Sequence, residues 1–176
     1  MNRIPVLDLK PQLASLKSEI LSAIEGVVES TAFINGPAVR EFETEAAAFL
    51  GAEHAVGVNS GTDALVIGLR ALGVGPGDEV ITTPFSFFAT AESISSVGAT
   101  PVFVDIEEES FNLDPKLLEA AITPRTKAIL PVHLFGRPAA MEEILAVACG
   151  NGLRVLEDCA QSFGARLHGD GDRTGT

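Results

Sequence analysis

Cysteine is scarce in this sequence, and its scarcity excludes a disulfide-stabilised fold. The two cysteines, Cys149 and Cys159, are too few for a disulfide framework. They also show no metal-ligand spacing with the three histidines, so no metal site is expected. Unpaired thiols are typical of reducing compartments, and we therefore expect a cytoplasmic protein.

Basic residues and long apolar runs are also scarce. Twelve lysines and arginines stand against 24 aspartates and glutamates, which leaves a formal charge of -12, and no run of five basic residues occurs. A surface of this sign repels phosphate backbones and anionic lipids, so neither nucleic acid nor a membrane is expected as a partner. The apolar stretches also fall short of the ~20 residues that cross a bilayer.

The length and pattern that remain are those of a globular chain. Its 176 residues are 46% hydrophobic and 20% charged, and at roughly 150 residues per domain they predict about one domain. Residues 1–51 are expected to form an N-terminal helical segment of two amphipathic helices. The first follows Pro11 and the second ends at Gly51, and both carry apolar residues at three- and four-residue steps.

Residues 52–176 alternate short β-branched runs with helical stretches, which predicts βαβ units. Crossovers of this length favour an α/β fold of three layers, with a mostly parallel sheet flanked by helices. The expected strands are Ala55–Val58, Glu79–Thr82, Pro101–Val104, Ala128–Val132 and Arg154–Leu156. The expected helices lie near Thr62–Leu72, Ala89–Val97, Pro115–Ala121 and Met141–Gly150.

Ligands of open parallel sheets bind outside the carboxyl ends of the strands, so the residues after each strand are the candidates. Ser60, Gly61 and Thr62 follow the first expected strand and lead into an apolar helix. Free backbone N–H groups in that first turn could hold an anion. The alternative is an ordinary helix cap by Ser60 or Thr62.

Three further strand ends carry candidate side chains. Phe85, Phe87 and Phe88 follow the second strand; at least two are expected in the core, and one could stack on a flat ligand. His133 follows the fourth strand, where a lone histidine is more often a hydrogen-bonded structural residue than a ligand. Asp158 follows the last strand and, if half desolvated, requires a cationic or hydrogen-bonding partner.

Together these residues describe a candidate ligand. It has an anionic group near Gly61, an aromatic ring near Phe87 and a protonated ring nitrogen near Asp158. Pyridoxal 5'-phosphate fits this description, because a carboxylate beside the pyridine nitrogen favours the protonated ring that acts as an electron sink.

Five segments resemble the sugar-nucleotide aminotransferases of the DegT–StrS family, which are fold-type-I pyridoxal-phosphate enzymes. The likeness runs from Ile4 to the last residue. The segments are Ser60–Leu65 (SGTDAL), Gly75–Ile81 (GPGDEVI), Phe85–Thr90 (FSFFAT), Pro131–Gly136 (PVHLFG) and Glu157–Ala165 (EDCAQSFGA).

The resemblance implies a role for each matching position. Gly61 and Thr62, with Asp63 through its backbone, would hold the cofactor phosphate. His133 lies in a family motif but receives no role.

The same resemblance implies that three other residues contact the ring of the cofactor. Phe87 would stack on the pyridine ring, Asp158 would pair with the ring nitrogen, and Gln161 would lie near the ring hydroxyl.

The family's Schiff-base lysine is expected downstream of Thr176, together with the small C-terminal domain. Residues 52–176 would then be part of the large pyridoxal-phosphate-binding domain, and the chain alone is expected to be inactive. None of its own lysines is expected to substitute; these are Lys10, Lys17, Lys116 and Lys127.

The resemblance implies transamination of a UDP- or dTDP-linked keto-sugar, with glutamate as amino donor, by a homodimer in polysaccharide or amino-sugar biosynthesis. Two alternatives stay open. One is the sibling group of sugar dehydratases, in which histidine replaces the lysine. The other is a remnant that binds a phosphate or nucleotide-sugar without chemistry.

Overall fold

The computed structural model describes residues 4–5, 7–167 and 174, and the chain divides into two compact units, residues 1–45 and 46–176. In the first unit, helix α1 (Lys10–Ser30) begins with a proline in its first turn, as predicted, and buries none of its residues. Helix α2 (Pro37–Leu50) starts directly after Gly36 and buries Ala46 and Ala47 near its end.

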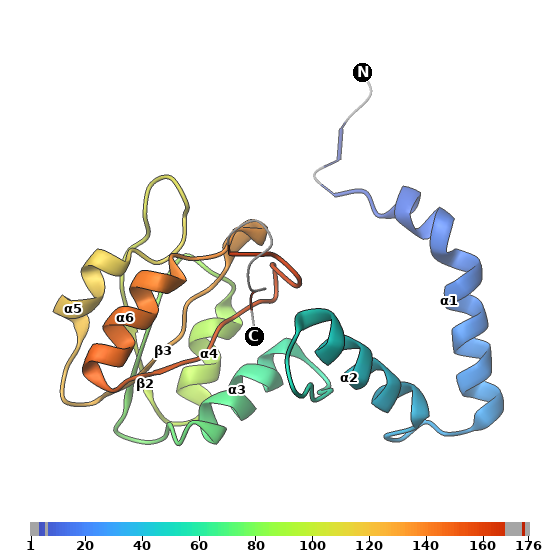
Figure 1. Cartoon of the computed structure of the whole chain (residues 1–176), viewed down its shortest axis with the longest axis horizontal. Coiled ribbons are helices and arrows are strands. Elements are labelled where there is room, and N and C mark those ends of the chain that lie inside the picture. The colour runs from blue at the N-terminus through green and yellow to red at the C-terminus, as the bar shows by residue number, and fades with distance from the viewer. Residues whose placement is uncertain (1–3, 6, 168–173, 175–176) are drawn as a thin grey trace. The chain divides into compact units, whose positions relative to one another are not determined.

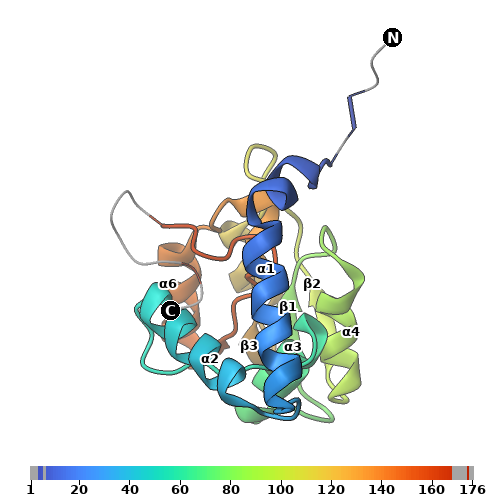
Figure 2. The ribbon, with the colours of Figure 1, turned by 90° about the vertical axis from the view of Figure 1, so that its right-hand side faces the viewer.

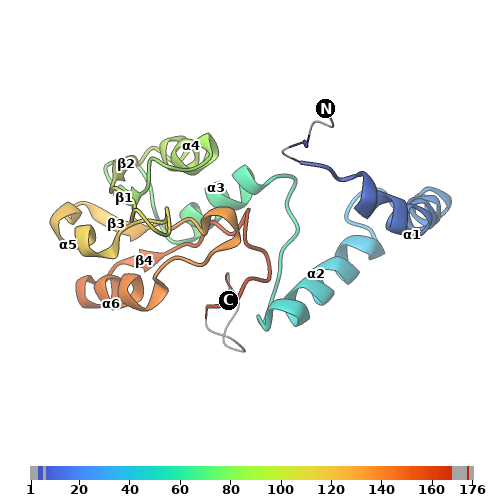
Figure 3. The ribbon, with the colours of Figure 1, turned by 90° about the horizontal axis from the view of Figure 1, so that it is seen from above.

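The second unit contains a four-stranded parallel sheet in the order β2-β1-β3-β4, and Figure 1 shows how its helices and strands follow one another along the chain. Helices α4 and α6 lie on opposite sides of the strands in Figure 2 and Figure 3. The strands are β1 (Glu79–Thr82), β2 (Thr100–Phe103), β3 (Thr126–Ile129) and β4 (Arg154–Val155). The helices are α3 (Gly61–Ala71), α4 (Phe88–Ser96), a short 3-10 turn (Pro115–Leu117) continued by α5 (Leu118–Ala121), a 3-10 turn (Leu134–Gly136) and α6 (Met141–Asn151).

Side chains of alternate residues in the buried strands pack into two separate hydrophobic cores, one on each face of the sheet. Val80 and Ala128 pack with α3 and α4, while Ile81 and Ile129 pack with α5 and α6. Successive strand side chains point to opposite faces, so a run of apolar residues is needed where both faces are covered. This arrangement confirms the three-layer α/β fold.

The strand expected at Ala55–Val58 is wrong. The segment has no strand pairing with any described residue, and Val56 is 80% exposed. Its β-branched pattern is compatible with a strand, but a strand also needs a neighbour to accept its backbone hydrogen bonds. The other four strands and the predicted helices are confirmed, with ends that coincide or are displaced by at most three residues.

Crossing a bilayer requires a helix that is both long and apolar, and none of the helices among the described residues meets this requirement.

A buried carboxylate ties β1 to the segment before β3 at the amino edge of the sheet. Glu79 is 6% exposed, accepts a hydrogen bond from the Thr123 hydroxyl and forms an ion pair with Arg125. The Thr123 hydrogen bond and the Arg125 charge hold the pKa of Glu79 below its ordinary value of 4.5, against burial, which raises it.

This arrangement predicts acid-sensitive stability. A carboxyl group whose pKa is lowered by folding stabilises the native state above its unfolded pKa, and the contribution is lost as the pH falls below 4.5. We therefore expect Glu79→Gln to lower the free energy of unfolding at pH 7 and to lose less stability than wild type between pH 5 and pH 3. Urea unfolding at several pH values measures both curves. Parallel curves would contradict the prediction.

Candidate functional site

Asp158 lies at the carboxyl edge of the sheet, two residues beyond Leu156. A parallel bridge between Val132 and Asp158 extends the pairing of β3 and β4 to this edge. The Asp158 N–H donates to the Pro131 carbonyl at 2.9 Å, and its carbonyl accepts from the His133 N–H at 3.2 Å. The backbone of Asp158 is thus held from both sides of the residue.

The side chain of Asp158 is held equally firmly. Only 8% of the residue is exposed, yet each carboxylate oxygen has a partner. Oδ2 accepts from the Thr90 hydroxyl at 2.9 Å, and Oδ1 accepts from the Ala160 N–H at 3.2 Å. Asp158 is therefore a satisfied, oriented carboxylate with spare lone pairs for a further donor.

A cavity of about 320 Å³ lies among the loops at this edge of the sheet, and Asp158 itself is not one of its lining residues. Two hydrogen bonds connect the cavity wall to Asp158: Ser86, which lines the cavity, bonds to Thr90, and Thr90 bonds to Asp158. Its lining residues come from the loop after β1, the turn after β3 and the turn after β4: Pro84, Phe85, Ser86, Phe87, Leu134, Phe135 and Gln161.

Gln161 presents hydrogen-bond donors at the cavity. Its side-chain oxygen accepts from the Phe135 N–H at 2.9 Å. The amide oxygen is therefore fixed toward the backbone, and the NH2 group makes no hydrogen bond to any described residue. Two free donors at this position suit an anionic oxygen of a ligand.

The expectation that at least two of the three phenylalanines pack in the core is wrong. Phe85 is 46% exposed and tilts against Phe111 with ring centroids 5.9 Å apart. Phe87 and Phe88 are each 74% exposed. Phe88 begins α4, which turns smaller side chains toward the sheet, among them Ala89 and Ser93, whereas Phe85 and Phe87 lie in the loop before the helix. Phe87 is left with an open ring in the cavity wall.

The N-terminus of α3 is the predicted anion site, and Ser60 caps it. The Ser60 hydroxyl accepts from the Asp63 N–H at 3.1 Å and lies 3.0 Å from the Asp63 carboxylate, to which it donates. The cap therefore uses the N–H of Asp63, and the backbone donors left for an anion are those of Gly61 and Thr62. Nothing lies within 4 Å of a Cβ built on Gly61, so an anion can approach closely.

Helix α3 begins at the same edge as Asp158. Its C-terminus at Ala71 leads directly into β1, which places that end at the amino edge and the opposite end, Gly61, at the carboxyl edge. The helix packs over β4, since a Cβ on Gly68 would lie 3.0 Å from Leu156. From this contact the helix rises about 10 Å to Gly61, while Asp158 lies about 7 Å along the strand.

Comparison with known proteins gives the family. Residues 14–176 match the DegT/DnrJ/EryC1/StrS aminotransferase family. The chain belongs to this family. The resemblance drawn from its five motifs is thereby confirmed.

Sugar aminotransferases are among the relatives of this DegT/DnrJ/EryC1/StrS chain. It is 52% identical over 168 residues to the UDP-N-acetyl-3-dehydro-alpha-D-glucosamine 3-aminotransferase of Acidithiobacillus ferrooxidans, covering 96% of this chain and 46% of the relative. It is 49% identical over 167 residues to the dTDP-3-amino-3,4,6-trideoxy-alpha-D-glucose transaminase of Streptomyces venezuelae, covering 95% and 44%. The chain thus spans about half the length of these relatives.

Solved structures agree with the fold. The S. venezuelae DesV structure in complex with a ketimine intermediate superposes with a TM-score of 0.95 at 48% identity, covering all of this chain and 47% of DesV. The Bacillus subtilis NtdA structure with bound cofactor PMP gives a TM-score of 0.88 at 38% identity, covering 93% of this chain and 38% of NtdA.

Two polar side chains of the candidate site were not assigned a role from the sequence. Thr90 bonds directly to Asp158, and Ser86 bonds to Thr90. Both lie within the phenylalanine-rich motif. A serine and a threonine four residues apart at a helix start could have signalled a pair on one helix face, but nothing local indicates the partner 68 residues away.

His133, Glu157 and Cys159 bring potential metal ligands within 4.8 Å of one another in the family's site region. The sequence spacing did not predict this cluster. His133 is fully buried; its Nδ1 accepts from the Ala139 N–H at 2.9 Å, and its Nε2 lies 2.7 Å from the Glu157 carboxylate. Since an N–H can only donate, the ring proton lies on Nε2, the nitrogen that faces Glu157. A metal would need that nitrogen unprotonated, and His133 is instead a structural donor.

The thiol of Cys159 is expected to react slowly with electrophiles. Burial and then the negative charge of Glu157 raise its pKa to about 11. At pH 8 only about a thousandth of such a thiol is thiolate, whereas Cys149 is exposed. We expect iodoacetamide to modify Cys149 at least about tenfold faster than Cys159. Peptide mass spectrometry over time measures the two rates, and equal rates would contradict this environment.

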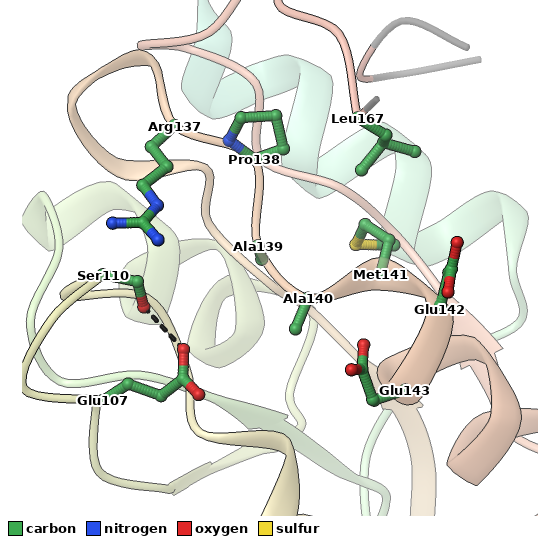
Figure 4. Close-up of a pocket in the computed structure, with 10 residues that line it drawn as sticks. All are labelled: Glu107, Ser110, Arg137, Pro138, Ala139, Ala140, Met141, Glu142, Glu143 and Leu167. Carbon is green, nitrogen blue, oxygen red and sulfur yellow. Dashed lines mark hydrogen bonds between the residues drawn. The ribbon is translucent and has the colours of Figure 1, made fainter. Parts of the chain in front are cut away.

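A second cavity of about 320 Å³ lies at the start of α6 (Figure 4). Its polar groups include three carboxylates, those of Glu107, Glu142 and Glu143, and the Arg137 guanidinium, which donates to the Glu109 carbonyl at 3.2 Å. Glu107 accepts from Ser110. Among the described residues that line this cavity, none is aromatic and none belongs to the five family motifs.

Proposed function

We propose that this chain provides the cofactor-binding part of a pyridoxal-phosphate-dependent aminotransferase that acts on a keto-sugar linked to UDP or dTDP. The observation that carries the proposal is Asp158, a nearly covered carboxylate held by two hydrogen bonds at the ligand-binding edge of the sheet. Such a carboxylate is suited to accept a hydrogen bond from one protonated nitrogen of a ligand. The names of the UDP- and dTDP-sugar relatives support the substrate class.

The residues at this edge fit pyridoxal phosphate. The N–H groups of Gly61 and Thr62 would hold its phosphate, with the Asp63 N–H committed to the Ser60 cap. Asp158 would keep the ring nitrogen protonated.

The remaining cofactor contacts come from the cavity wall. The exposed Phe87 ring would cover one face of the pyridine, and the free amide of Gln161 would donate to the ring oxygen. When bound, the cofactor supplies an electron sink for the carbon next to the substrate nitrogen.

The whole protein would take its amino group from glutamate and act as a homodimer in polysaccharide or amino-sugar biosynthesis. The name of a relative that is 56% identical over 146 residues, the spore coat polysaccharide biosynthesis protein SpsC of Bacillus subtilis, supports this setting. Within this proposal, residues 1–51 form a helical segment and residues 52–176 belong to the cofactor-binding domain.

Titration with pyridoxamine 5'-phosphate tests the site, because this amine form of the cofactor needs no lysine for binding. We expect saturable binding of one molecule per chain, followed by cofactor fluorescence. Pyridoxamine without the phosphate is expected to bind at least about tenfold more weakly, since it cannot use the α3 N-terminus. Equal binding of the two compounds, or none of the phosphate form at millimolar concentration, would overturn the proposal.

The lysines of this chain are not expected to bond covalently to pyridoxal phosphate. Lys127 lies at the irregularity between β1 and β3, at the amino edge, and Lys10, Lys17 and Lys116 are exposed on helices and turns. Borohydride reduction of the 176-residue chain with the cofactor should therefore leave no stoichiometric adduct, as measured by mass spectrometry. One full equivalent on Lys127 would contradict this prediction.

A further inference from the structure

A chain of three hydrogen-bonding side chains connects the cavity wall to Asp158. Ser86 Oγ lies 2.9 Å from Thr90 Oγ1, which donates to Asp158 Oδ2 at 2.9 Å. An ionised carboxylate only accepts, and a threonine hydroxyl has one proton. The direction is therefore determined: Ser86 donates to Thr90, and Thr90 donates to Asp158.

Thr90 uses its proton differently from its neighbours on α4. Ser93 and Ser95 donate to the carbonyls of Thr90 and Ala91, three and four residues earlier, which is the ordinary habit of a helical hydroxyl. Thr90 instead donates to a residue 68 positions away while 1% exposed. Its β-branched side chain has few rotamers, so the donor is held in one direction.

We propose that Thr90 and Ser86 are positioning residues that set the orientation of the Asp158 carboxylate relative to Phe87, and so control protonation of the cofactor ring nitrogen. This inference rests on the proposed function. The two groups that would hold the ring come from different elements, since Phe87 precedes α4 and Asp158 follows β4. The hydrogen-bond chain joins these elements, and Ser86 is the residue directly before Phe87.

The orientation of Asp158 depends on two attachments that come from different segments. Ala160 holds Oδ1 through its backbone and belongs to the turn after β4. Thr90 holds Oδ2 and belongs to α4. Removing the Thr90 hydroxyl leaves one attachment, around which the carboxylate can rotate. A rotated carboxylate no longer aligns with the ring nitrogen, and its effect on that nitrogen falls.

Binding of pyridoxamine 5'-phosphate labelled with 15N in the ring tests the proposal. The 15N chemical shift reports directly whether the ring nitrogen is protonated, and a titration gives the affinity. We expect Thr90→Val to bind about tenfold more weakly and to move the shift toward that of the neutral ring. Thr90→Ser keeps the hydroxyl but not the methyl group that limits its rotamers, and it should stay closer to wild type than to Thr90→Val in both measurements. Ser86→Ala should produce a smaller change in the same direction, and Ser95→Ala, on the same helix, none.

The possible outcomes distinguish failure of the cofactor site from failure of the positioning role. Failure of wild type to bind the probe overturns the cofactor site and the positioning role with it. Weak binding by Asp158→Asn together with wild-type behaviour of Thr90→Val overturns the positioning role alone. Thr90→Ser behaving like Thr90→Val also overturns it, because the hydroxyl would then not matter. If Thr90→Val does not fold, an unchanged 15N shift in Ser86→Ala is the overturning result.

Discussion

Asparagine at position 158 is expected to weaken the binding of pyridoxamine 5'-phosphate about a hundredfold, or about 2.7 kcal/mol. The amide keeps the shape of the carboxylate; its oxygen can accept from the Ala160 N–H and its NH2 group can donate to the Thr90 hydroxyl, so the fold should be retained. What it loses is the negative charge that favours a protonated ring nitrogen, in a site where little water screens the interaction. Fluorescence titration at pH 7.5 measures the change.

Asp105→Asn is the matched control for that experiment. Asp105 follows β2 at the same edge of the sheet, is exposed, and carries the same charge. If the effect came only from the overall charge of this edge, both variants would weaken binding alike. A loss of less than threefold in Asp158→Asn would show that the carboxylate does not pair with the ring nitrogen.

His133→Leu is expected to lower the free energy of unfolding by about 3 kcal/mol. His133 is fully buried and satisfies two groups, the Ala139 N–H and the Glu157 carboxylate. Leucine fills a similar volume, so the loss comes from the buried Ala139 N–H, which loses its acceptor, and from the lost hydrogen bond to Glu157, rather than from a cavity. A urea unfolding curve measures the difference through its midpoint.

His54→Leu provides the comparison for this second experiment. The His54 side chain is 82% exposed beside Glu53, and its replacement should change stability by no more than about 0.5 kcal/mol. Equal effects of the two leucine substitutions would mean that the His133 hydrogen bonds contribute nothing net to stability. In that case the neutral, Nε2-protonated histidine would no longer be a structural element of the site.

Local patterns predicted most of the elements for identifiable reasons. The apolar spacing of α3 and α6 determines a helix because side chains three and four residues apart share one face. The predicted strands Glu79–Thr82 and Ala128–Val132 were recognisable because their apolar residues pack on both faces of the sheet. Ala55–Val58 carries the same kind of pattern and forms no strand, since pairing depends on a distant segment.

Some features of the candidate site were likewise predictable from local patterns, and others were not. Phe87 and Asp158 were expected at one edge because both follow parallel strands, which end in the same direction. Gly61 was expected there because it follows Ala55–Val58, but that segment forms no strand, and the connection from α3 to β1 places Gly61 at this edge instead. The hydrogen bond from Thr90 to Asp158 followed from no pattern. Neither did the tautomer of His133, which depends on the Ala139 N–H.

Sequence alone determined the type of layers, the candidate ligand-binding edge and the residue types that line it, since these depend on periodicity and on the order of elements along the chain. Tertiary structure alone decided which polar groups meet, which phenylalanine rings stay exposed and which donors remain free. The physical reason is the distance along the chain over which each interaction acts. Helix periodicity and turn chemistry act over a few residues, whereas a hydrogen bond between Thr90 and Asp158 forms only after β1, β3 and β4 have assembled.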